Sequence, residues 1–202
     1  MIPPGPDHPI VPSSDHLIIR SSHHPIIRVV VTGSECTGKT TLAMALAKHY
    51  GTPWVPEYAR QFVLEKGAAP VYRDVEAIAH GQIAIENSLA AGASHLLIQD
   101  TDLLSTVLYS RHYYGDCPGR VEDELRNRGV DLYLLADIDV LWVADGEHRD
   151  RGDLREEMQA LFRRALIEGG LRFVEIRGSR DQRSRIAVGA IDELLADAAR
   201  NR

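Results

Sequence analysis

Short apolar runs alternate with segments of helical spacing along the chain from Ile26 onward. The apolar runs cover residues 26–32, 53–56, 95–99, 131–136 and 171–176. Several of them are apolar throughout, as strands are when both faces of a parallel sheet are covered. We therefore predict an α/β fold, a doubly wound parallel sheet of about five strands with helices on both faces.

The segments between these runs repeat apolar residues at helical spacing. One helix is expected before Gly92, a second ends near the glycines at 169–170, and a third closes the chain. Their apolar faces carry Val75, Ile78, Ala79 and Ile83, then Leu154, Met158, Leu161, Phe162, Ala165 and Leu166, then Ala187, Ile191, Leu194, Leu195 and Ala198. Ligands of such sheets bind at the carboxyl ends of the strands, so residues that follow each strand are the first candidates for a site.

Residues 1–25 differ in composition from the rest of the chain. They hold six of the ten prolines and four of the nine histidines. Such a segment cannot bury enough apolar surface to offset the entropy lost on ordering it. We therefore expect a disordered Pro/His-rich tail at 1–25 and one folded domain at 26–202, with metal binding by the histidines as the alternative role of the tail.

The overall composition argues against several classes of protein. The 202 residues are 44% hydrophobic and 26% charged, as in ordinary globular proteins, and the net charge of -6 makes a nucleic-acid partner unexpected. No apolar run approaches the roughly 18 residues that cross a bilayer, and the N-terminus lacks the pattern of a signal peptide. Cys36 and Cys117 give no disulfide framework. We expect a cytoplasmic protein without membrane contact, and the sequence does not indicate its oligomeric state.

A phosphate-binding motif stands between the first apolar run and a helical segment closed by Gly51. Its pattern is Gly33, four residues, then Gly38, Lys39 and Thr40, which is typical of P-loop NTPases. Successive amides at the start of a helix surround a β-phosphate with partial positive charge. Lys39 is expected to reach the β- and γ-phosphates of ATP, and Thr40 to ligate Mg²⁺. A glycine-rich turn that arises by chance is the alternative. The predicted nucleotide-binding residues are Gly33, Ser34, Glu35, Cys36, Thr37, Gly38, Lys39, Thr40 and Thr41.

A magnesium–nucleotide site needs a carboxylate near the P-loop, and the third apolar run supplies one. Residues 95–99 lead into Asp100, and Asp102 follows on the same side of an extended chain. We expect one carboxylate to hold the metal, directly or through water, and the other to accept the proton of an attacking hydroxyl. For Asp102 the alternative is that it caps a helix over 103–114.

Charged residues also follow the other strands. After the second run, Glu57 is placed to contact a substrate hydroxyl or act as a base, and Arg60 to bind a phosphate or orient a carboxylate. A surface pair between the two is the alternative reading. Residues 142–152 have the composition of a mobile lid, where Arg149 and Arg151 would stabilise the charge of a transferring phosphoryl group, or else form a solvated charged loop.

The loop after the fifth run is a candidate for binding the nucleotide base. Ser179 and Arg180 stand there, where a loop of P-loop kinases often binds adenine. A plain helix start with Ser179 as its N-cap fits the same residues equally well.

Four blocks together resemble the ribosylnicotinamide kinase domain of bacterial NadR proteins, an AAA-type P-loop ATPase/kinase group. They are GSECTGKTT at 33–41, EYARQFV at 57–63, DTD at 100–102 and WVADG at 142–146, and the resemblance runs from about residue 26 to the C-terminus. It implies transfer of the γ-phosphate of ATP to the 5′-hydroxyl of nicotinamide riboside. It also implies that Glu57, Asp100 and Asp102 line the nucleoside site and that Arg149 belongs to a lid.

The chain departs from the family pattern at two places. Pro56 stands where a tryptophan precedes the Glu-Tyr pair, and Trp54 lies two residues earlier, with its ring expected on the same strand face. Trp54 and Tyr58 therefore join the substrate-binding residues that the resemblance implies. The lid segment has one residue more before Arg149 than the pattern.

These observations leave three functions open. The leading one is an ATP-dependent nucleoside kinase with nicotinamide riboside as the acceptor and Mg²⁺ as the metal. The second keeps the kinase and changes the acceptor to another nucleoside, a nucleotide or an RNA end. The third is an ATP-dependent switch that is not a kinase. Paired carboxylates at strand ends favour transfer chemistry, since a switch needs only metal and phosphate contacts.

Overall fold

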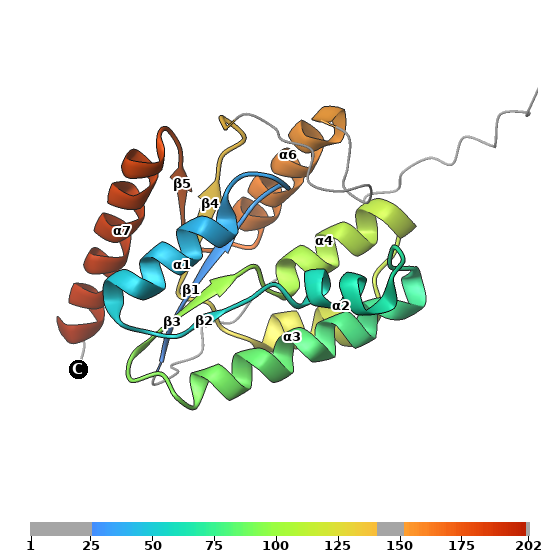
Figure 1. Cartoon of the computed structure of the whole chain (residues 1–202), viewed down its shortest axis with the longest axis horizontal. Helices are drawn as coiled ribbons and strands as arrows, with labels where there is room; N and C mark the ends of the chain where they lie inside the picture. The colour runs from blue at the N-terminus through green and yellow to red at the C-terminus, as the bar shows by residue number, and fades with distance from the viewer. Residues whose placement is uncertain (1–25, 141–151, 201–202) are drawn as a thin grey trace, which may run out of the picture.

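The computed structural model describes residues 26–140 and 152–200, which form an α/β fold (Figure 1). The sheet has five parallel strands in the order β2-β3-β1-β4-β5. Each strand overlaps one of the apolar runs, so the predicted doubly wound parallel sheet is confirmed. The strands are β1 (Ile27–Thr32), β2 (Trp54–Val55), β3 (Leu96–Asp100), β4 (Leu132–Ala136) and β5 (Phe173–Ile176).

β1 lies in the middle of the sheet and carries the P-loop at its carboxyl end. It pairs with β3, in a register that sets Val31 beside Asp100, and with β4, where Thr32 lies beside Leu135. The side chains of β3 and β4 are all buried because helices cover both faces of the sheet, which explains the continuous apolar runs. The register brings the P-loop, Asp100 and Asp137 to the same edge of the sheet.

Seven α-helices and one short 3-10 helix accompany the strands in the described residues, and the last helix follows β5. Three of the helices, α3, α6 and α7, confirm those predicted from apolar spacing. α1 ends at Gly51, whose φ of 61° is the left-handed conformation that glycine favours at a helix end. The helices are α1 (Lys39–Tyr50), α2 (Tyr58–Lys66), η1 (Tyr72–Asp74), α3 (Val75–Ala90), α4 (Leu103–Tyr114), α5 (Gly119–Asn127), α6 (Gly152–Glu168) and α7 (Arg180–Arg200).

Helices α1 and α7 cover one face of the sheet, while α3, α4, α5 and α6 cover the other (Figure 1). The core under α1 and α7 contains Val29, Val31, Ile98, Leu134, Leu42, Leu46, Ala187 and Ile191. The core on the opposite face contains Val30, Tyr133, Leu135, Leu103, Leu104, Leu125, Phe162 and Leu166. Each large side chain buried in this way contributes about 1.5–3 kcal/mol to folding, so the two cores fix the sheet edge that carries the site.

Residues 1–25, 141–151 and 201–202 lie outside the described part of the chain. The predicted tail falls in the first of these ranges, and most of the predicted lid, with Arg149 and Arg151, falls in the second. In the residues that are described, no helix is long and apolar enough to cross a membrane.

Candidate active site

The P-loop follows β1 and passes closely over the end of β4. Gly33 has a φ of 124°, and a Cβ at this residue would lie 2.7 Å from the carbonyl oxygen of Ala136. Only glycine fits such a close approach and such a backbone conformation. Cys36 and Gly38 have φ values of 53° and 80°, so the loop turns sharply twice more before α1 begins. The sequence motif therefore forms a tight backbone turn at the amino end of a helix.

Side chains of the P-loop bind its own backbone. The Thr37 hydroxyl and the Lys39 ammonium both donate to the Ser34 carbonyl, at 2.9 and 2.8 Å. Lys39 is the first residue of α1, so its side chain reaches back across the loop. Ser34 and Thr37 are buried, whereas Thr41 is exposed on α1. The ammonium thus already lies over the region where the P-loop motif places phosphate groups.

Two side chains of α6 bind backbone groups of the P-loop. Oε1 of Gln159 accepts a hydrogen bond from the Ser34 amide at 3.1 Å. The guanidinium of Arg155 donates to the carbonyl oxygens of Glu35 and Cys36, each at 3.2 Å. The loop is therefore held by an element more than a hundred residues away along the chain.

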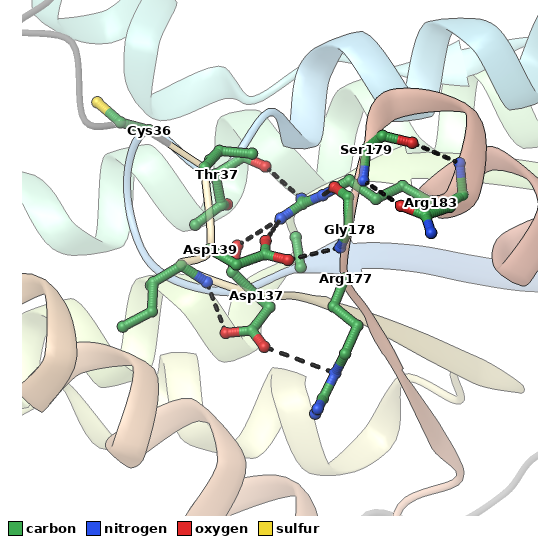
Figure 2. Close-up of polar contacts among 12 residues, drawn as sticks. Cys36, Thr37, Asp137, Asp139, Arg177, Gly178, Ser179 and Arg183 are labelled. Atoms are coloured by element: carbon green, nitrogen blue, oxygen red, sulfur yellow. Dashed lines mark hydrogen bonds and ion pairs between the residues drawn. The ribbon is translucent and has the colours of Figure 1, made fainter.

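Arg183 of α7 binds the end of the same loop (Figure 2). Its Nη1 donates to the Thr37 carbonyl and its Nη2 to the Asp137 carbonyl, both at 2.8 Å. Nε donates to the Gly178 carbonyl at 3.0 Å, and the guanidinium forms an ion pair with Asp139. One buried side chain thereby joins the P-loop to the ends of β4 and β5.

Three side chains that contact the P-loop were not predicted from the sequence: Arg155, Gln159 and Arg183. All three are buried, and Arg183 continues at helical spacing the face that Ala187 and Ile191 form on α7. A charged or amide side chain at an apolar position of a helix is seldom buried unless it has partners. A polar residue at an apolar position of a predicted helix is therefore the sequence feature that could have identified these contacts.

Thr40 and Asp100 meet at the sheet edge between β1 and β3. The Thr40 hydroxyl donates to Oδ2 of Asp100 at 2.5 Å. The second oxygen, Oδ1, is buried and has no hydrogen-bond partner among the described residues. Burial raises the pKa of Asp100 above its usual value, and the Thr40 hydrogen bond opposes this shift. A hydroxyl and a carboxylate oxygen without a partner suit Mg²⁺, which completes its oxygen ligands with phosphate and water.

Asp102 does not lie beside Asp100. Thr101 between them has a φ of 66°, so the extended geometry expected over 100–102 is wrong. Asp102 is the N-cap of α4: Oδ1 accepts from the Leu104 amide at 3.1 Å, and Oδ2 accepts from the Tyr133 hydroxyl at 2.7 Å. The helix-cap alternative is thus confirmed. Burial raises the pKa of Asp102 to about 7 in spite of these hydrogen bonds.

Glu57 and Arg60 lie where β2 gives way to α2. They form an ion pair at 3.5 Å, and the side chains are 27% and 47% exposed, so the surface pair left open by the sequence is present. Such an exposed pair contributes little to stability. β2 pairs with β3 in a register that sets Val55 beside Gln99, so Glu57 follows β2 at the same edge of the sheet as Asp100. The charge of Glu57 also acts to raise the pKa of Asp100.

The aromatic residues near Glu57 lie in two different places. The Tyr58 amide donates to Oε1 of Gln82 at 2.9 Å, and the Tyr58 ring lies directly on Gly81, where a Cβ would come within 2.0 Å of it. α3 therefore holds Tyr58 at the end of β2. Trp54, in contrast, packs against the hydrophobic core under α1 and α7.

The loop between β5 and α7 borders an open pocket of about 470 Å³, lined by Asp139, Arg177, Gly178, Gln182, Arg185 and Ile186. The Ser179 hydroxyl accepts from the Gln182 amide at 3.3 Å, and the Gln182 side chain accepts from the Ser179 amide at 2.8 Å (Figure 2). This reciprocal pair caps α7, so the N-cap alternative for Ser179 is confirmed. Arg180 is the first residue of α7. The pocket adjoins the P-loop through Arg183, which binds Gly178 and Thr37 together.

The chain has curated relatives in two enteric bacteria. The trifunctional NAD biosynthesis/regulator protein NadR of Escherichia coli (strain K12) is 29% identical over 153 residues, which are 73% of this chain and 37% of the relative. The protein of the same description from Salmonella typhimurium (strain LT2) is 28% identical over 154 residues, 74% of this chain and 38% of the relative. The chain thus spans less than two fifths of the length of these relatives.

Solved structures show the same fold. A crystal structure of NadR protein in complex with NR aligns with a TM-score of 0.72 and 25% identity, over 85% of this chain and 52% of that one. A thymidylate kinase from Ehrlichia chaffeensis aligns with a TM-score of 0.60 at 16% identity, over 85% of this chain and 100% of that one, and shows the fold alone. The predicted P-loop kinase fold and the predicted resemblance to NadR proteins are confirmed.

A family assignment follows from the sequence match. Residues 28–183 match the family model described as AAA domain, and this range includes the P-loop, Asp100 and the two arginines that bind the loop. Together with the NadR relatives, the match supports an enzyme of the kinase type. The chain belongs to the AAA domain family.

Proposed function

We propose that this chain is an ATP-dependent kinase that transfers the γ-phosphate of ATP to the 5′-hydroxyl of nicotinamide riboside. The observation that carries the proposal is the contact of Thr40 with Asp100 beside a formed P-loop, in a fold that aligns with a NadR structure in complex with NR. A P-loop alone serves many nucleotide-binding proteins, but NadR relatives over most of the chain favour transfer to a nucleoside.

The phosphate end of ATP binds in the P-loop. The loop amides and the Lys39 ammonium contact the β- and γ-phosphates, as the motif requires. Mg²⁺ held by Thr40 and Asp100 would neutralise the charge that develops on the transferring phosphoryl group. The base of the nucleotide lies toward the pocket beside Gly178, near Ser179 and Arg180.

The acceptor binds at the ends of β2 and β3. Glu57, which follows β2 at the same edge of the sheet as Asp100, accepts the proton of the attacking hydroxyl. Tyr58, held by α3, offers its ring to the acceptor, and Arg60 keeps Glu57 oriented through their ion pair. Asp102 acts indirectly here, because its carboxylate caps α4 and binds Tyr133.

The test is ADP release from Mg-ATP in the presence of a panel of nucleosides, nucleotides and RNA ends. Release that nicotinamide riboside alone stimulates, with formation of the mononucleotide, is the expected result. Lys39→Ala should abolish turnover, because the ammonium over the phosphates is lost, while far-ultraviolet circular dichroism stays unchanged. Lys48→Ala, on an exposed position of the same helix, is the matched control and should keep full activity.

The other outcomes separate the alternatives. ADP release stimulated by a different acceptor would keep the kinase and reject nicotinamide riboside. Slow hydrolysis that no acceptor changes would reject the kinase and favour a nucleotide-dependent switch. Full turnover by Lys39→Ala would remove the P-loop from the reaction.

A further inference from the structure

Three successive carbonyl groups of the P-loop each accept a hydrogen bond from a buried arginine. Arg155 donates to the carbonyls of Glu35 and Cys36 at 3.2 Å, and Arg183 donates to the carbonyl of Thr37 at 2.8 Å. The arginines are only 9% and 6% exposed and come from different helices. Burial of two cations is costly unless each is fully engaged by acceptors, so these contacts account for their place in the fold.

The contacts determine where the loop amides point. A trans peptide group is planar, so its carbonyl and the amide of the next residue point in opposite directions. With the carbonyls of residues 35–37 bound to the arginines, the amides of Cys36, Thr37 and Gly38 each point away from the arginine that binds their peptide group. Successive amides of a P-loop are the groups that bind an anion.

Each arginine is also anchored outside the loop. Arg155 donates a further hydrogen bond to the Val140 carbonyl at 3.1 Å. Arg183 is held by the Asp137 and Gly178 carbonyls and by the carboxylate of Asp139, which also accepts from the Gly178 amide (Figure 2). The position of the P-loop is therefore set by the end of β4 and by the β5–α7 loop rather than by the loop residues alone.

The charge of Asp139 supports this arrangement. Partial burial acts to raise the pKa of Asp139, but hydrogen bonds from the Gly178 amide and from Arg183 outweigh it and hold that pKa below its usual value. The carboxylate is accordingly ionised at neutral pH. Arg183 then has an anionic partner on one side and neutral carbonyls on the others.

We propose that Arg155 and Arg183 are positioning residues for phosphate binding, which orient the P-loop amides and place two positive charges beside the loop without touching the nucleotide. The proposal rests on the proposed function only in that ATP is the ligand of the P-loop. Because each arginine uses several donors of its planar fork at once, lysine keeps the charge but cannot reproduce the geometry.

The experiment measures phosphate binding in Arg155→Lys and Arg183→Lys of the full chain. Calorimetry gives the affinity for inorganic tripolyphosphate, which reports on the P-loop alone, and for ATP. Each variant should bind both about tenfold more weakly, since misdirected amides lose charge-assisted hydrogen bonds. The Michaelis constant for the acceptor should stay near that of Arg172→Lys, a matched control whose arginine pairs with Asp197 on the surface. The melting temperature should fall in each variant, because lysine leaves buried carbonyl groups without a donor.

Two results would overturn the proposal. One is an affinity for tripolyphosphate equal to that of the control in both variants. The other is a rise in the Michaelis constant for the acceptor by the same factor as the loss of tripolyphosphate affinity, or a failure of both variants to fold, which would assign the arginines a general structural role.

Measurements on the unmodified chain distinguish failure of this proposal from failure of the proposed kinase activity. If it binds tripolyphosphate but releases no ADP with any acceptor, the proposed kinase fails and the affinity ratios still decide the role of the arginines. If it binds neither tripolyphosphate nor ATP, both proposals fail.

Discussion

Asp100 and Asp102 are separated by one residue, yet their carboxylates have different surroundings. Asp100 faces Thr40 and keeps one oxygen free of partners among the described residues, whereas Asp102 has both oxygens engaged by α4 and Tyr133. The left-handed backbone of Thr101 causes the difference, because it ends the two-residue alternation of the strand. Only Asp100 remains available to a metal ion.

Asp100→Asn tests the metal role. Asparagine has the same size and its amide oxygen can still accept the Thr40 hydrogen bond, so the fold and the affinity for ATP should change little. Loss of the charge should lower kcat by about a hundredfold or more, as expected when a group that stabilises transition-state charge is removed. Steady-state kinetics over a range of Mg²⁺ concentrations measure this change, and full activity would exclude Asp100 from the chemistry.

Asp102→Asn should change how stability depends on pH. Since the pKa of Asp102 is raised to about 7 in the folded chain, the folded state keeps a proton that the unfolded state releases above about pH 4. The folded state then binds more protons between these values, so this group's contribution to stability falls as pH rises and stays low above pH 7. Asparagine does not titrate and retains an acceptor for Tyr133.

The free energy of unfolding of Asp102→Asn, relative to the parent, should therefore rise between about pH 5 and about pH 8. Urea unfolding at the two pH values measures it. Asp123→Asn is the control that removes a carboxylate from the surface, where the Asp123 side chain is 66% exposed. A difference between Asp102→Asn and the parent that does not change with pH would show that Asp102 does not titrate in this range.

At the scale of elements, α3 supports the acceptor side through adjacent residues. Gly81 makes room for the Tyr58 ring, and Gln82 binds the Tyr58 amide while its own amide donates to Glu86 at 3.3 Å. Glu86 is itself buried and paired with Arg128 at 2.8 Å. A series of polar contacts thus extends along the covered face of α3 to the end of β2.

Two helix glycines provide a matched test of this support. Gly81→Ala places a Cβ within 2.0 Å of the Tyr58 ring, so the ring must move and the Michaelis constant for the acceptor should rise while that for ATP stays unchanged. Gly189→Ala in α7 meets no atom within 4 Å. It should raise the free energy of unfolding by about 0.5–1 kcal/mol, the usual gain of alanine over glycine in a helix.

Chemical denaturation measures the free energy of unfolding of both glycine variants, and steady-state kinetics measure their Michaelis constants. A gain in stability for Gly81→Ala equal to that of Gly189→Ala, with unchanged kinetics, would mean that the contact between Gly81 and Tyr58 has no consequence for the acceptor.

At the scale of the whole molecule, the strand order brings the residues of the site together. β1 lies between β3 and β4, so the P-loop meets Asp100 on one side and the end of β4 on the other. α6 and α7 cover opposite faces of the sheet and both reach the P-loop with an arginine. The loop is thereby fixed by contacts from both faces of the fold.

We propose that residues 26–202 fold and act as one domain. Deletion of residues 1–24 should leave ADP release and the melting temperature almost unchanged, because this Pro/His-rich composition cannot bury enough apolar surface to contribute. Differential scanning calorimetry and the kinase assay on the shortened chain measure both quantities. A large loss in either one would make the tail part of the folded domain.

Helices α2 and α5 were not predicted from the spacing of apolar residues. α2 has no buried residue, and α5 buries only Val121 and Leu125. Apolar spacing cannot reveal helices that bury so little, whereas α3, α6 and α7 each bury a full stripe and were predicted.

The sequence by itself determined the apolar runs that form the strands, the P-loop motif and the place of Asp100 at the end of one run, because each is a pattern of residues that are neighbours in the chain. Tertiary structure decided the rest. It turned Asp102 into a helix cap, packed Trp54 against the core and brought Arg183 to Thr37 across 146 residues. Local periodicity reports which side of an element is covered, but the partner of a buried polar side chain depends on how distant elements pack, and no local pattern contains that information.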